Sequence, residues 1–253
     1  MTRRALVAKT YKLYLGGAFV RSESGRSDVT SEGVNVPRAS RKDVRDAVKA
    51  ARAAQAGWAK KTAYNRGQVL YRFAEALESR GWGEDEAVDL LVHYAGWTDK
   101  LASVMGGINP VAMPYLSFST PEPTGVVAVL APDEPDVLGL IREVAPALAA
   151  GNTVVAIVSR THPLRPLDLG EVAGVSDIPA GVLNLLSGRL DELLEPLCGH
   201  RDVNAIVDTT GSARVDELAA ETVKRVTRPS GDDTLARLEA LTELKTAWHP
   251  IGA

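Results

Sequence analysis

The sequence predicts an α/β protein built on a Rossmann-like, doubly wound parallel sheet. Two β-rich apolar runs, Val126–Leu130 and Thr153–Val158, enclose a helical segment at Val137–Ala150, which makes one strand–helix–strand unit. The same alternation continues with short connections to about Arg225, and such units wind with right-handed crossovers. A chain of 253 residues is long enough to bury the core of such a sheet.

The composition is that of a globular protein, with 45% hydrophobic and 24% charged residues. The net charge is −3, and Lys and Arg are scattered among acids, which argues against a nucleic-acid partner or a membrane surface. No apolar run approaches the roughly 20 residues of a membrane span, and the first residues lack the pattern of a secretory leader. A single cysteine cannot form an internal disulfide. We therefore expect a cytoplasmic protein.

Residues 1–107 are predicted to begin with a hairpin. The pair Gly16-Gly17 separates two β-rich runs, Tyr11–Leu15 and Ala18–Arg21, as a tight primed turn requires. The polar stretch Ser22–Glu32 follows, without a predicted element, and then an extended segment at Asn35–Arg38. These features place a small β-structure before the first helix.

Three helices are predicted in the rest of this region. Ser40, followed three residues later by Asp43, has the pattern of a capped helix start, and Gly57 is a plausible helix end. The apolar spacing of the next segments is helical. It predicts helices over Thr62–Ser79 and from Glu84 to Gly106.

The composition of residues 108–124 differs from that of the predicted helices before them. They hold four prolines and no helical period, and they are too apolar for an ordinary solvated loop. A segment of this kind usually lies against another surface. We predict an extended, partly β segment here.

Residues 125–228 are predicted to form the parallel sheet, and residues 229–253 a linker, a short helix and a β-like tail. The further predicted elements are strands at Val182–Leu186 and Val203–Val207, helices at Pro166–Ala173, Leu190–Leu197, Ala213–Arg225 and Thr234–Leu241, and the tail Leu244–Pro250. The chain shows no internal repeat beyond this alternation.

Several motifs occur in an order that resembles the aldehyde dehydrogenase superfamily. They are Tyr14–Gly17 with Phe19-Val20, His93–Lys100 (HYAGWTDK), Glu122–Val127 (EPTGVV), Pro146–Val155 (PALAAGNTVV), Ser176–Asn184 (SDIPAGVLN) and Glu243–Trp248 (ELKTAW). The resemblance covers about Tyr11 to Val226 and the tail. It implies a member that lacks the catalytic domain but keeps the coenzyme-type domain, together with an oligomerisation arm made of residues 108–124 and the tail.

The resemblance implies no catalytic residues in this chain. Family catalysis uses a cysteine thiolate, a glutamate base and an asparagine that helps to hold the oxyanion. The cysteine and the glutamate belong to the part that has no counterpart after Val226. The asparagine would fall where this chain has Asp133-Glu134, and a carboxylate cannot donate a hydrogen bond to an oxyanion.

Cofactor contacts are also altered. The family's KPSE, which engages the adenosine ribose, corresponds to Ile157–Arg160 here. The glycine-rich turn that binds pyrophosphate is kept as Thr210–Ser212, but its second glycine corresponds to Asp216, whose charge would repel a phosphate. We expect no bound cofactor, with NAD or NADP as the candidates if one binds. The vestigial cofactor contacts would be Ser159, Gly188, Gly211 and Ser212.

Cys198 is predicted to be structural rather than nucleophilic. It lies near the end of a helix, before Gly199, a typical helix-ending residue. His200 could act as its base only if the helix end brought the two together. The four histidines are scattered, with no pair at metal-ligand spacing, so we expect no metal site.

Two functions remain open, together with a third reading in which the chain is a decayed remnant. The favoured one is a non-catalytic subunit, a pseudoenzyme that assembles with an active full-length aldehyde dehydrogenase, or with itself, through the arm and the C-terminal strand. The alternative is an NAD(P)-binding protein, or a residual oxidoreductase that borrows a catalytic domain in trans. The sequence leaves the partner, its aldehyde and the stoichiometry undetermined.

Overall fold

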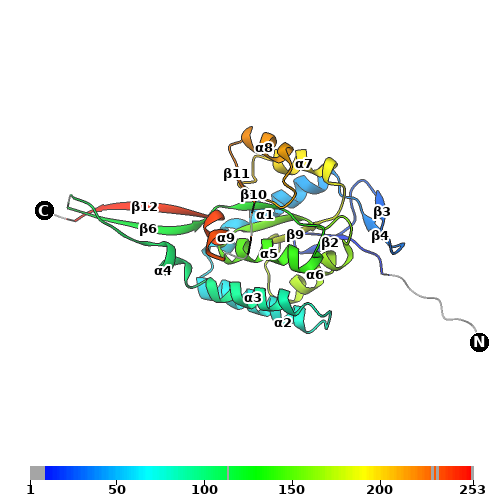
Figure 1. Ribbon diagram of the computed structural model, residues 1–253, viewed down its shortest axis with the longest axis horizontal. Helices are drawn as coiled ribbons and strands as arrows, with labels where there is room; N and C mark the ends of the chain where they lie inside the picture. Colours follow the sequence, from blue (N-terminus) through cyan, green and yellow to red (C-terminus); the bar gives the residue numbers. More distant parts are fainter. Residues whose placement is uncertain (1–8, 113, 229–230, 232–233, 252–253) are drawn as a thin grey trace, which may run out of the picture.

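The computed structural model describes residues 9–112, 114–228, 231 and 234–251. The expectation about a leader rests on residues that fall mostly outside this range, as does much of the predicted linker at 229–233. Figure 1 shows a body of helices packed on a sheet, with a narrow second sheet projecting from one end.

A seven-stranded sheet forms the centre of the body in the described residues. Its order is β11-β10-β7-β8-β9-β1-β2; the strands from β11 to β9 are parallel, and the antiparallel hairpin β1–β2 joins at the β9 edge. These strands are β1 (Leu13–Leu15), β2 (Ala18–Val20), β7 (Val126–Leu130), β8 (Thr153–Ile157), β9 (Leu183–Leu186), β10 (Ala205–Asp208) and β11 (Arg225–Thr227). The predicted Rossmann-like α/β class is confirmed.

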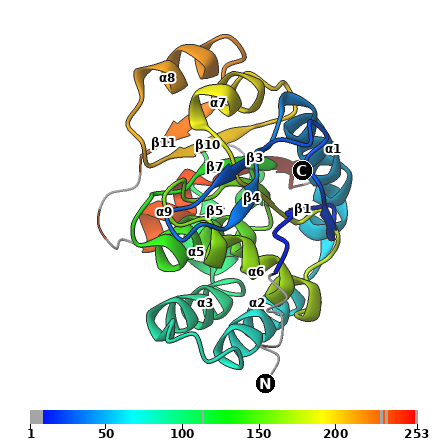
Figure 2. The same ribbon diagram turned by 90° about the vertical axis from the view of Figure 1, so that its right-hand side faces the viewer.

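Helices cover both faces of this sheet (Figure 2). The central strands β7 and β8 are buried along their whole length, as their continuous apolar runs require in a parallel sheet. Two hydrophobic clusters result, one on each face. One face packs against five helices, which are α2 (Ala63–Glu78), α3 (Asp85–Trp97), α5 (Asp136–Ala149), α6 (Leu164–Val175) and α9 (Thr234–Ala240). The other face packs against three, which are α1 (Arg41–Lys60), α7 (Leu190–Cys198) and α8 (Ala213–Ala220).

The N-terminal helices follow the predicted order with two differences. The first helix, α1 (Arg41–Lys60), starts with the predicted capping box of Ser40 and Asp43. Gly57 does not end it, because Trp58 is buried and its indole N–H donates to the Leu148 carbonyl at 3.1 Å. That packing holds the last turn in helical form. The predicted third helix is divided at its last turns; the remaining helices are α2 (Ala63–Glu78), α3 (Asp85–Trp97) and α4 (Leu101–Met105).

A second, three-stranded antiparallel sheet projects from the body (Figure 1). It consists of β5 (Gly107–Asn109), β6 (Tyr115–Pro123) and β12 (Thr242–Pro250), in the order β12-β6-β5. All nine residues of β12 pair with β6, from Thr242 opposite Pro123 to Pro250 opposite Tyr115. We call this sheet the arm. The predicted extended segment and the predicted tail thus lie side by side, although more than 100 residues separate them in the sequence.

Two strands, β3 (Ser27–Val29) and β11, were not predicted from the sequence. The first of them, β3, lies in the polar stretch before the first helix and pairs with β4 (Asn35–Pro37). The predicted helix over Ala213–Arg225 is wrong at its end, because α8 stops at Ala220 and Val223 adopts a positive φ of 53°. A β-branched residue rarely takes that conformation, and the turn redirects the chain into β11.

No helix in the described part of the chain is long and apolar enough to cross a bilayer.

Candidate functional site

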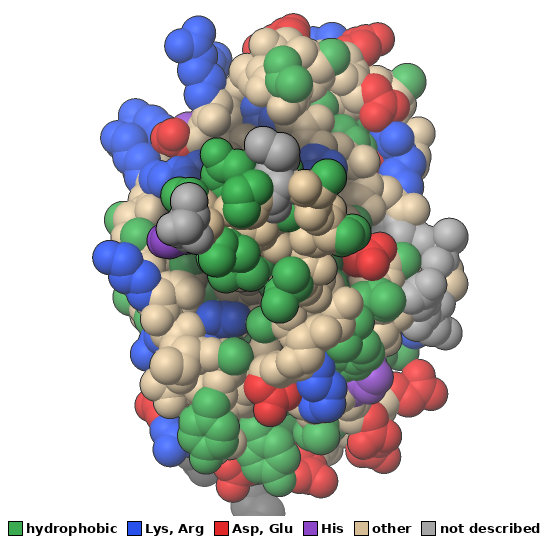
Figure 3. Space-filling model, turned by 90° about the vertical axis from the view of Figure 1, so that its left-hand side faces the viewer, with side chains coloured by type: hydrophobic (Ala, Val, Ile, Leu, Met, Phe, Trp, Pro, Cys, Tyr) green, Lys and Arg blue, Asp and Glu red, His purple; other side chains and the backbone are tan. Residues whose placement is uncertain are grey.

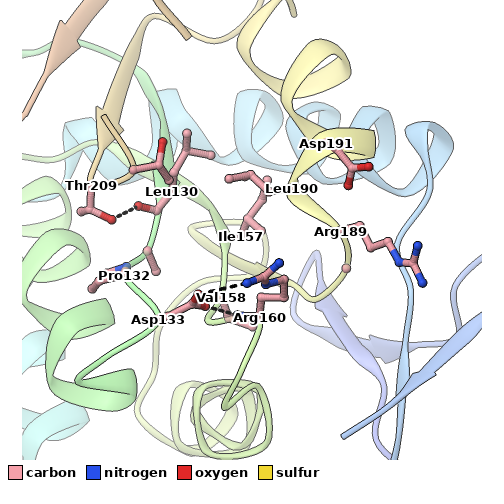
Figure 4. Close-up of a pocket in the computed structure, with 13 residues that line it drawn as sticks. Leu130, Pro132, Asp133, Ile157, Val158, Arg160, Arg189, Leu190, Asp191 and Thr209 are labelled. Carbon is pink, nitrogen blue, oxygen red and sulfur yellow. Dashed lines mark hydrogen bonds and ion pairs between the residues drawn. The ribbon is translucent and has the colours of Figure 1, made fainter. Parts of the chain in front are cut away.

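A cavity of about 850 Å³ opens at the carboxyl ends of β7, β8, β9 and β10 (Figure 4). Part of its wall is apolar, from Leu130 at the end of β7, Ile157 at the end of β8 and Leu190 at the start of α7. Open α/β sheets bind ligands beyond the carboxyl ends of their strands, where the strand order reverses. That reversal occurs at β7, which lies between β8 and β10. The cavity is therefore the candidate ligand site.

The loops that follow β7 and β8 are tied together around Asp133. Its Oδ1 accepts hydrogen bonds from the amides of Arg160 at 2.7 Å and Thr161 at 3.3 Å. The Ser159 hydroxyl donates to the Asp133 carbonyl at 2.9 Å and accepts from the His162 amide at 2.9 Å. Ser159 was predicted as a vestigial cofactor contact. Its side chain is 1% exposed and bonded within the loop, and it is its neighbour Arg160 that lines the cavity.

Gly188, the second predicted contact, does line the cavity. Its φ is +155°, and an added Cβ would lie 3.0 Å from Leu193 Cδ1 and 3.1 Å from the Ala39 amide nitrogen. A glycine is needed there for backbone conformation and for packing. The same absence of a side chain lets a ligand approach the backbone at this point.

Gly211 and Ser212 lie in the turn that leads from β10 to α8. Gly211 has a φ of +67°, and the Ser212 amide donates to the Thr210 hydroxyl at 3.3 Å. Thr209 and Thr210, just before them, line the cavity. The structure thus gathers this turn and Gly188 around one site, and places the predicted Gly211 and Ser212 beside its wall.

An ion-pair network behind this turn was missed from sequence. The Asp208 carboxylate, fully buried at the end of β10, accepts from the Thr210 amide at 2.9 Å and the Thr210 hydroxyl at 2.6 Å. Arg228 pairs with Asp208 at 3.0 Å and with Asp216 at 2.9 Å. These contacts, the bond to Asp216 foremost, raise the pKa of the Arg228 guanidinium. The carboxylate of Asp216, expected to repel a phosphate, is therefore balanced by a cation that only the fold brings near.

Glu134 points away from the candidate site. Its carboxylate is largely exposed and lies 3.2 Å from Nε2 of His162. It lines a separate, shallow hollow with Pro135 and Asp136. The residue that was predicted to be incompatible with an oxyanion site therefore forms a surface hydrogen bond with His162.

The rim of the cavity carries charges of both signs. Arg160 and Asp133 face each other at 3.9 Å, and Arg189 and Asp191 lie on the opposite side (Figure 4). Arg189 forms an ion pair with Asp28 at 3.6 Å. With two arginines and two aspartates, the rim has no strong net charge. The site suits a ligand with a sizeable apolar part better than a highly charged anion.

The chain's single cysteine is not placed for catalysis. Cys198 is fully buried on α7, and burial, reinforced by the charge of Asp208, raises the pKa of its thiol to about 12. His200 uses its Nδ1 to accept from the Asp202 amide at 3.2 Å. The thiol is therefore protonated at neutral pH and has no base in place. Among the residues that the structure describes, no cluster of three or more His, Cys, Asp or Glu could hold a metal ion.

The sequence matches the pattern of the "Aldehyde dehydrogenase family" over residues 28–82 and 82–231. It is 33% identical to 2-hydroxymuconic semialdehyde dehydrogenase from Pseudomonas sp. (strain CF600), an alignment that covers 87% of this chain and 51% of that protein. The chain thus spans about half the length of the curated relatives it matches.

Comparison with solved structures also finds aldehyde dehydrogenases. The NAD+ complex of an aldehyde dehydrogenase from Bacillus cereus matches with a TM-score of 0.80 and 25% identity, over 86% of this chain and 50% of that one. PnpE in complex with nicotinamide adenine dinucleotide matches with a TM-score of 0.80 and 28% identity, over 86% and 50% of the two chains. PnpE from Pseudomonas sp. WBC-3 matches with a TM-score of 0.79 and 29% identity over the same shares.

Proposed function

The chain belongs to the aldehyde dehydrogenase family, and from this premise we propose that it is a non-catalytic subunit that assembles with, and supports, an active aldehyde dehydrogenase. The contact surface would be the arm. We also propose a cytoplasmic setting, in which the unpaired cysteine stays reduced.

The observation that carries this proposal is the apolar surface of the arm. Large hydrophobic side chains are exposed along a sheet that stands off the body (Figure 1), and Figure 3 shows hydrophobic side chains on the end of the molecule from which the arm projects. They are Ile108, Tyr115, Leu116, Phe118, Leu244 and Trp248. The strand registers place Ile108, Leu116 and Phe118 on one face of the sheet, and Tyr115, Leu244 and Trp248 on the other. Exposed apolar side chains gathered in this way mark protein–protein contact sites. Ile108 has the largest exposed fraction of these, 77%, and leaving such apolar side chains in water is unfavourable.

The environment of Cys198, the single cysteine of the sequence, supports the non-catalytic part of the proposal. The thiol of Cys198 is buried and protonated, with His200 bonded elsewhere. A nucleophile needs an adjacent base or a depressed pKa to attack a carbonyl carbon. Neither condition holds for Cys198.

The proposal is tested by co-purification from the cells that make this chain, followed by light scattering of the purified complex. We expect a full-length aldehyde dehydrogenase to be retained. Phe118→Asp and Ile108→Asp should each weaken retention at least tenfold, because they place a charge in the apolar surface. The matched control is Tyr71→Asp, which alters an exposed aromatic residue on α2, away from the arm. Equal retention of all three variants, or no aldehyde dehydrogenase at all, would contradict the proposal.

The cavity supports a second candidate, an NAD(P)-binding protein that could take part in oxidoreductase chemistry with a catalytic domain supplied in trans. Its volume suits a ligand of this class, and Leu130 and Ile157 could pack against a nucleobase. The fit is partial, because Asp133 adds a carboxylate and Ile157 an apolar side chain to the lining, whereas phosphate and ribose need hydrogen-bond donors. A bound dinucleotide would supply the hydride acceptor.

Calorimetric titration with NAD and with NADP separates the two candidates. Binding in the micromolar range would favour the nucleotide-binding function. A flat titration up to millimolar cofactor would count against it and leave the assembly role unaffected.

A further inference from the structure

The cavity at the carboxyl ends of β7 to β10 combines an apolar wall with a polar rim. Six of the 13 residues that line it have apolar side chains, and they come from the ends of β7 and β8, the loops that follow these strands and the start of α7. They are Leu130, Ala131, Pro132, Ile157, Val158 and Leu190. A wall of this kind binds the apolar part of a ligand by removing it from water. With a volume of about 850 Å³, the cavity has room for an extended apolar group.

The two hydroxyl groups in the described lining donate their protons within the fold. The Thr209 hydroxyl donates to the Leu130 carbonyl at 2.8 Å, and the Thr210 hydroxyl donates to the Asp208 carboxylate at 2.6 Å. A hydroxyl group has one proton to donate. These two residues therefore offer acceptors to a ligand, and the side-chain donors that remain in the described lining are two arginines.

The two arginines differ in how they are placed. Figure 4 shows the Arg160 guanidinium reaching into the cavity beside Ile157, whereas Arg189 extends away from it. Arg189 also forms an ion pair with Asp28 at 3.6 Å. The Arg160 guanidinium lies 3.9 Å from Asp133, a long ion pair, and its side chain is 70% exposed. Arg160 is therefore the cation that a ligand in the cavity would meet.

The charges of the rim favour a ligand with a single negative group. One guanidinium binds one carboxylate through two parallel hydrogen bonds. The Asp133 carboxylate is held by main-chain amides at 2.7 and 3.3 Å, so Arg160 can turn from it to a ligand. The carboxylates of Asp133 and Asp191 both line the cavity. A second negative charge on the ligand would be repelled by them without a second free arginine to balance it.

We propose that the cavity binds a monocarboxylate with an extended apolar part, with its carboxylate on the Arg160 guanidinium and its apolar part against the wall. This ligand goes beyond the proposed function, because it binds the chain whether or not the chain is assembled with a partner. A dinucleotide differs from it in carrying a pyrophosphate, whose two charges would meet one free arginine.

Calorimetric titration with straight-chain probes tests the ligand class. In the series butanoate, hexanoate and octanoate, each added CH2 should tighten binding about fourfold, because it is buried against the wall. 1-Octanol, which keeps the chain but lacks the charge, should bind about tenfold more weakly than octanoate. Octyl phosphate, with its additional charge, should also bind more weakly. Equal affinity of octanoate and 1-octanol, or tighter binding of octyl phosphate, would overturn the inference.

A charge-removing variant tests the place of the carboxylate. Arg160→Gln should weaken octanoate binding about tenfold or more and leave 1-octanol binding unchanged. The matched control is Arg201→Gln, which removes an exposed arginine beyond the end of α7, outside the cavity lining. This control should bind octanoate as the unchanged chain does. Unchanged octanoate binding in Arg160→Gln would overturn the inference.

A variant of the wall tests the place of the apolar part. Leu190→Gln should weaken octanoate and 1-octanol by the same factor, about fivefold or more, because it puts a polar group where both chains would lie. Urea unfolding of this variant checks that the fold is kept. A folded Leu190→Gln chain that binds both probes as before would overturn the proposed position of the apolar part.

The outcomes distinguish this inference from the proposed functions. A chain that retains an aldehyde dehydrogenase but binds none of the probes overturns the inference and leaves the assembly role intact. A chain that binds NAD in the micromolar range and no octanoate also overturns it, in favour of the nucleotide-binding function. Octanoate binding that depends on Arg160 in a chain that retains no aldehyde dehydrogenase supports the inference and counts against the assembly role.

Discussion

At the scale of single residues, the candidate site combines residues retained for folding with residues that burial makes unreactive. Gly188 and Gly211 keep conformations that suit glycine best. The Ser159 hydroxyl is bonded within its loop. A residue type at the right place in a motif therefore does not reveal whether its functional group is free.

The buried thiol gives a direct prediction at this scale. Burial raises the pKa of Cys198 from 9.0 to about 12, which lowers the thiolate fraction near pH 8 about 1000-fold. Alkylation by iodoacetamide should therefore be negligible in the folded protein and fast in denaturant, as mass spectrometry can measure. Rapid labelling without denaturant would show that the thiol is accessible.

His200 gives a prediction about pH. Burial foremost lowers its pKa below the ordinary value of 6.5; the charge of Asp202 opposes this shift, and the cations of Lys224, Arg52 and Lys49 add to it. The unfolded chain then binds a proton more readily than the folded one, so this residue's contribution to stability is present above pH 6.5 and is lost as the pH falls below it. Urea unfolding between pH 7.5 and 5.5 should show a smaller loss of unfolding free energy in His200→Gln than in the unchanged chain. An equal loss of unfolding free energy in His200→Gln and in the unchanged chain would contradict this prediction.

At the scale of elements, a buried ion pair fixes the root of the arm. Arg237 on α9 and Glu143 on α5 lie 2.5 Å apart, both almost fully buried. Burial raises the pKa of Glu143, and Arg237 opposes that rise. Because α9 leads directly into β12, this pair helps to fix where the C-terminal strand begins.

Removing one partner of this ion pair should therefore lower the free energy of unfolding. Arg237→Met leaves the Glu143 carboxylate buried without its cation, and should lower the free energy of unfolding by about 3–5 kcal/mol. The double variant Glu143→Leu/Arg237→Met should lose much less, because no charge remains buried. Denaturant titration of both variants measures the difference. If the double variant loses as much as the single one, packing rather than charge explains the effect.

At the scale of the whole molecule, the body and the arm differ in how they are stabilised. The main sheet is covered on both faces by hydrophobic clusters, while most of β12 is exposed. Regions with few buried apolar contacts open more easily. The amides of β12 should therefore exchange with deuterium faster than those of β7 and β8.

Exchange also reports on assembly. If the arm is the contact surface for an aldehyde dehydrogenase partner, the amides of β12 should become protected when that partner is added, while those of β7 and β8 should not change. Mass spectrometry with and without the partner measures these strands in one experiment. Unchanged exchange of β12 in a complex that does form would point to a contact outside the arm.

The sequence determined the fold class and most elements of this protein, because continuous apolar runs, capping residues and turn glycines act locally. It also located the glycine-rich turn beside the cavity and the two segments of the arm. Only the tertiary structure decided which distant groups meet. Arg228 balances Asp216, Trp58 carries α1 past Gly57, and β12 pairs with β6, since each depends on contacts between segments that the chain order does not bring together.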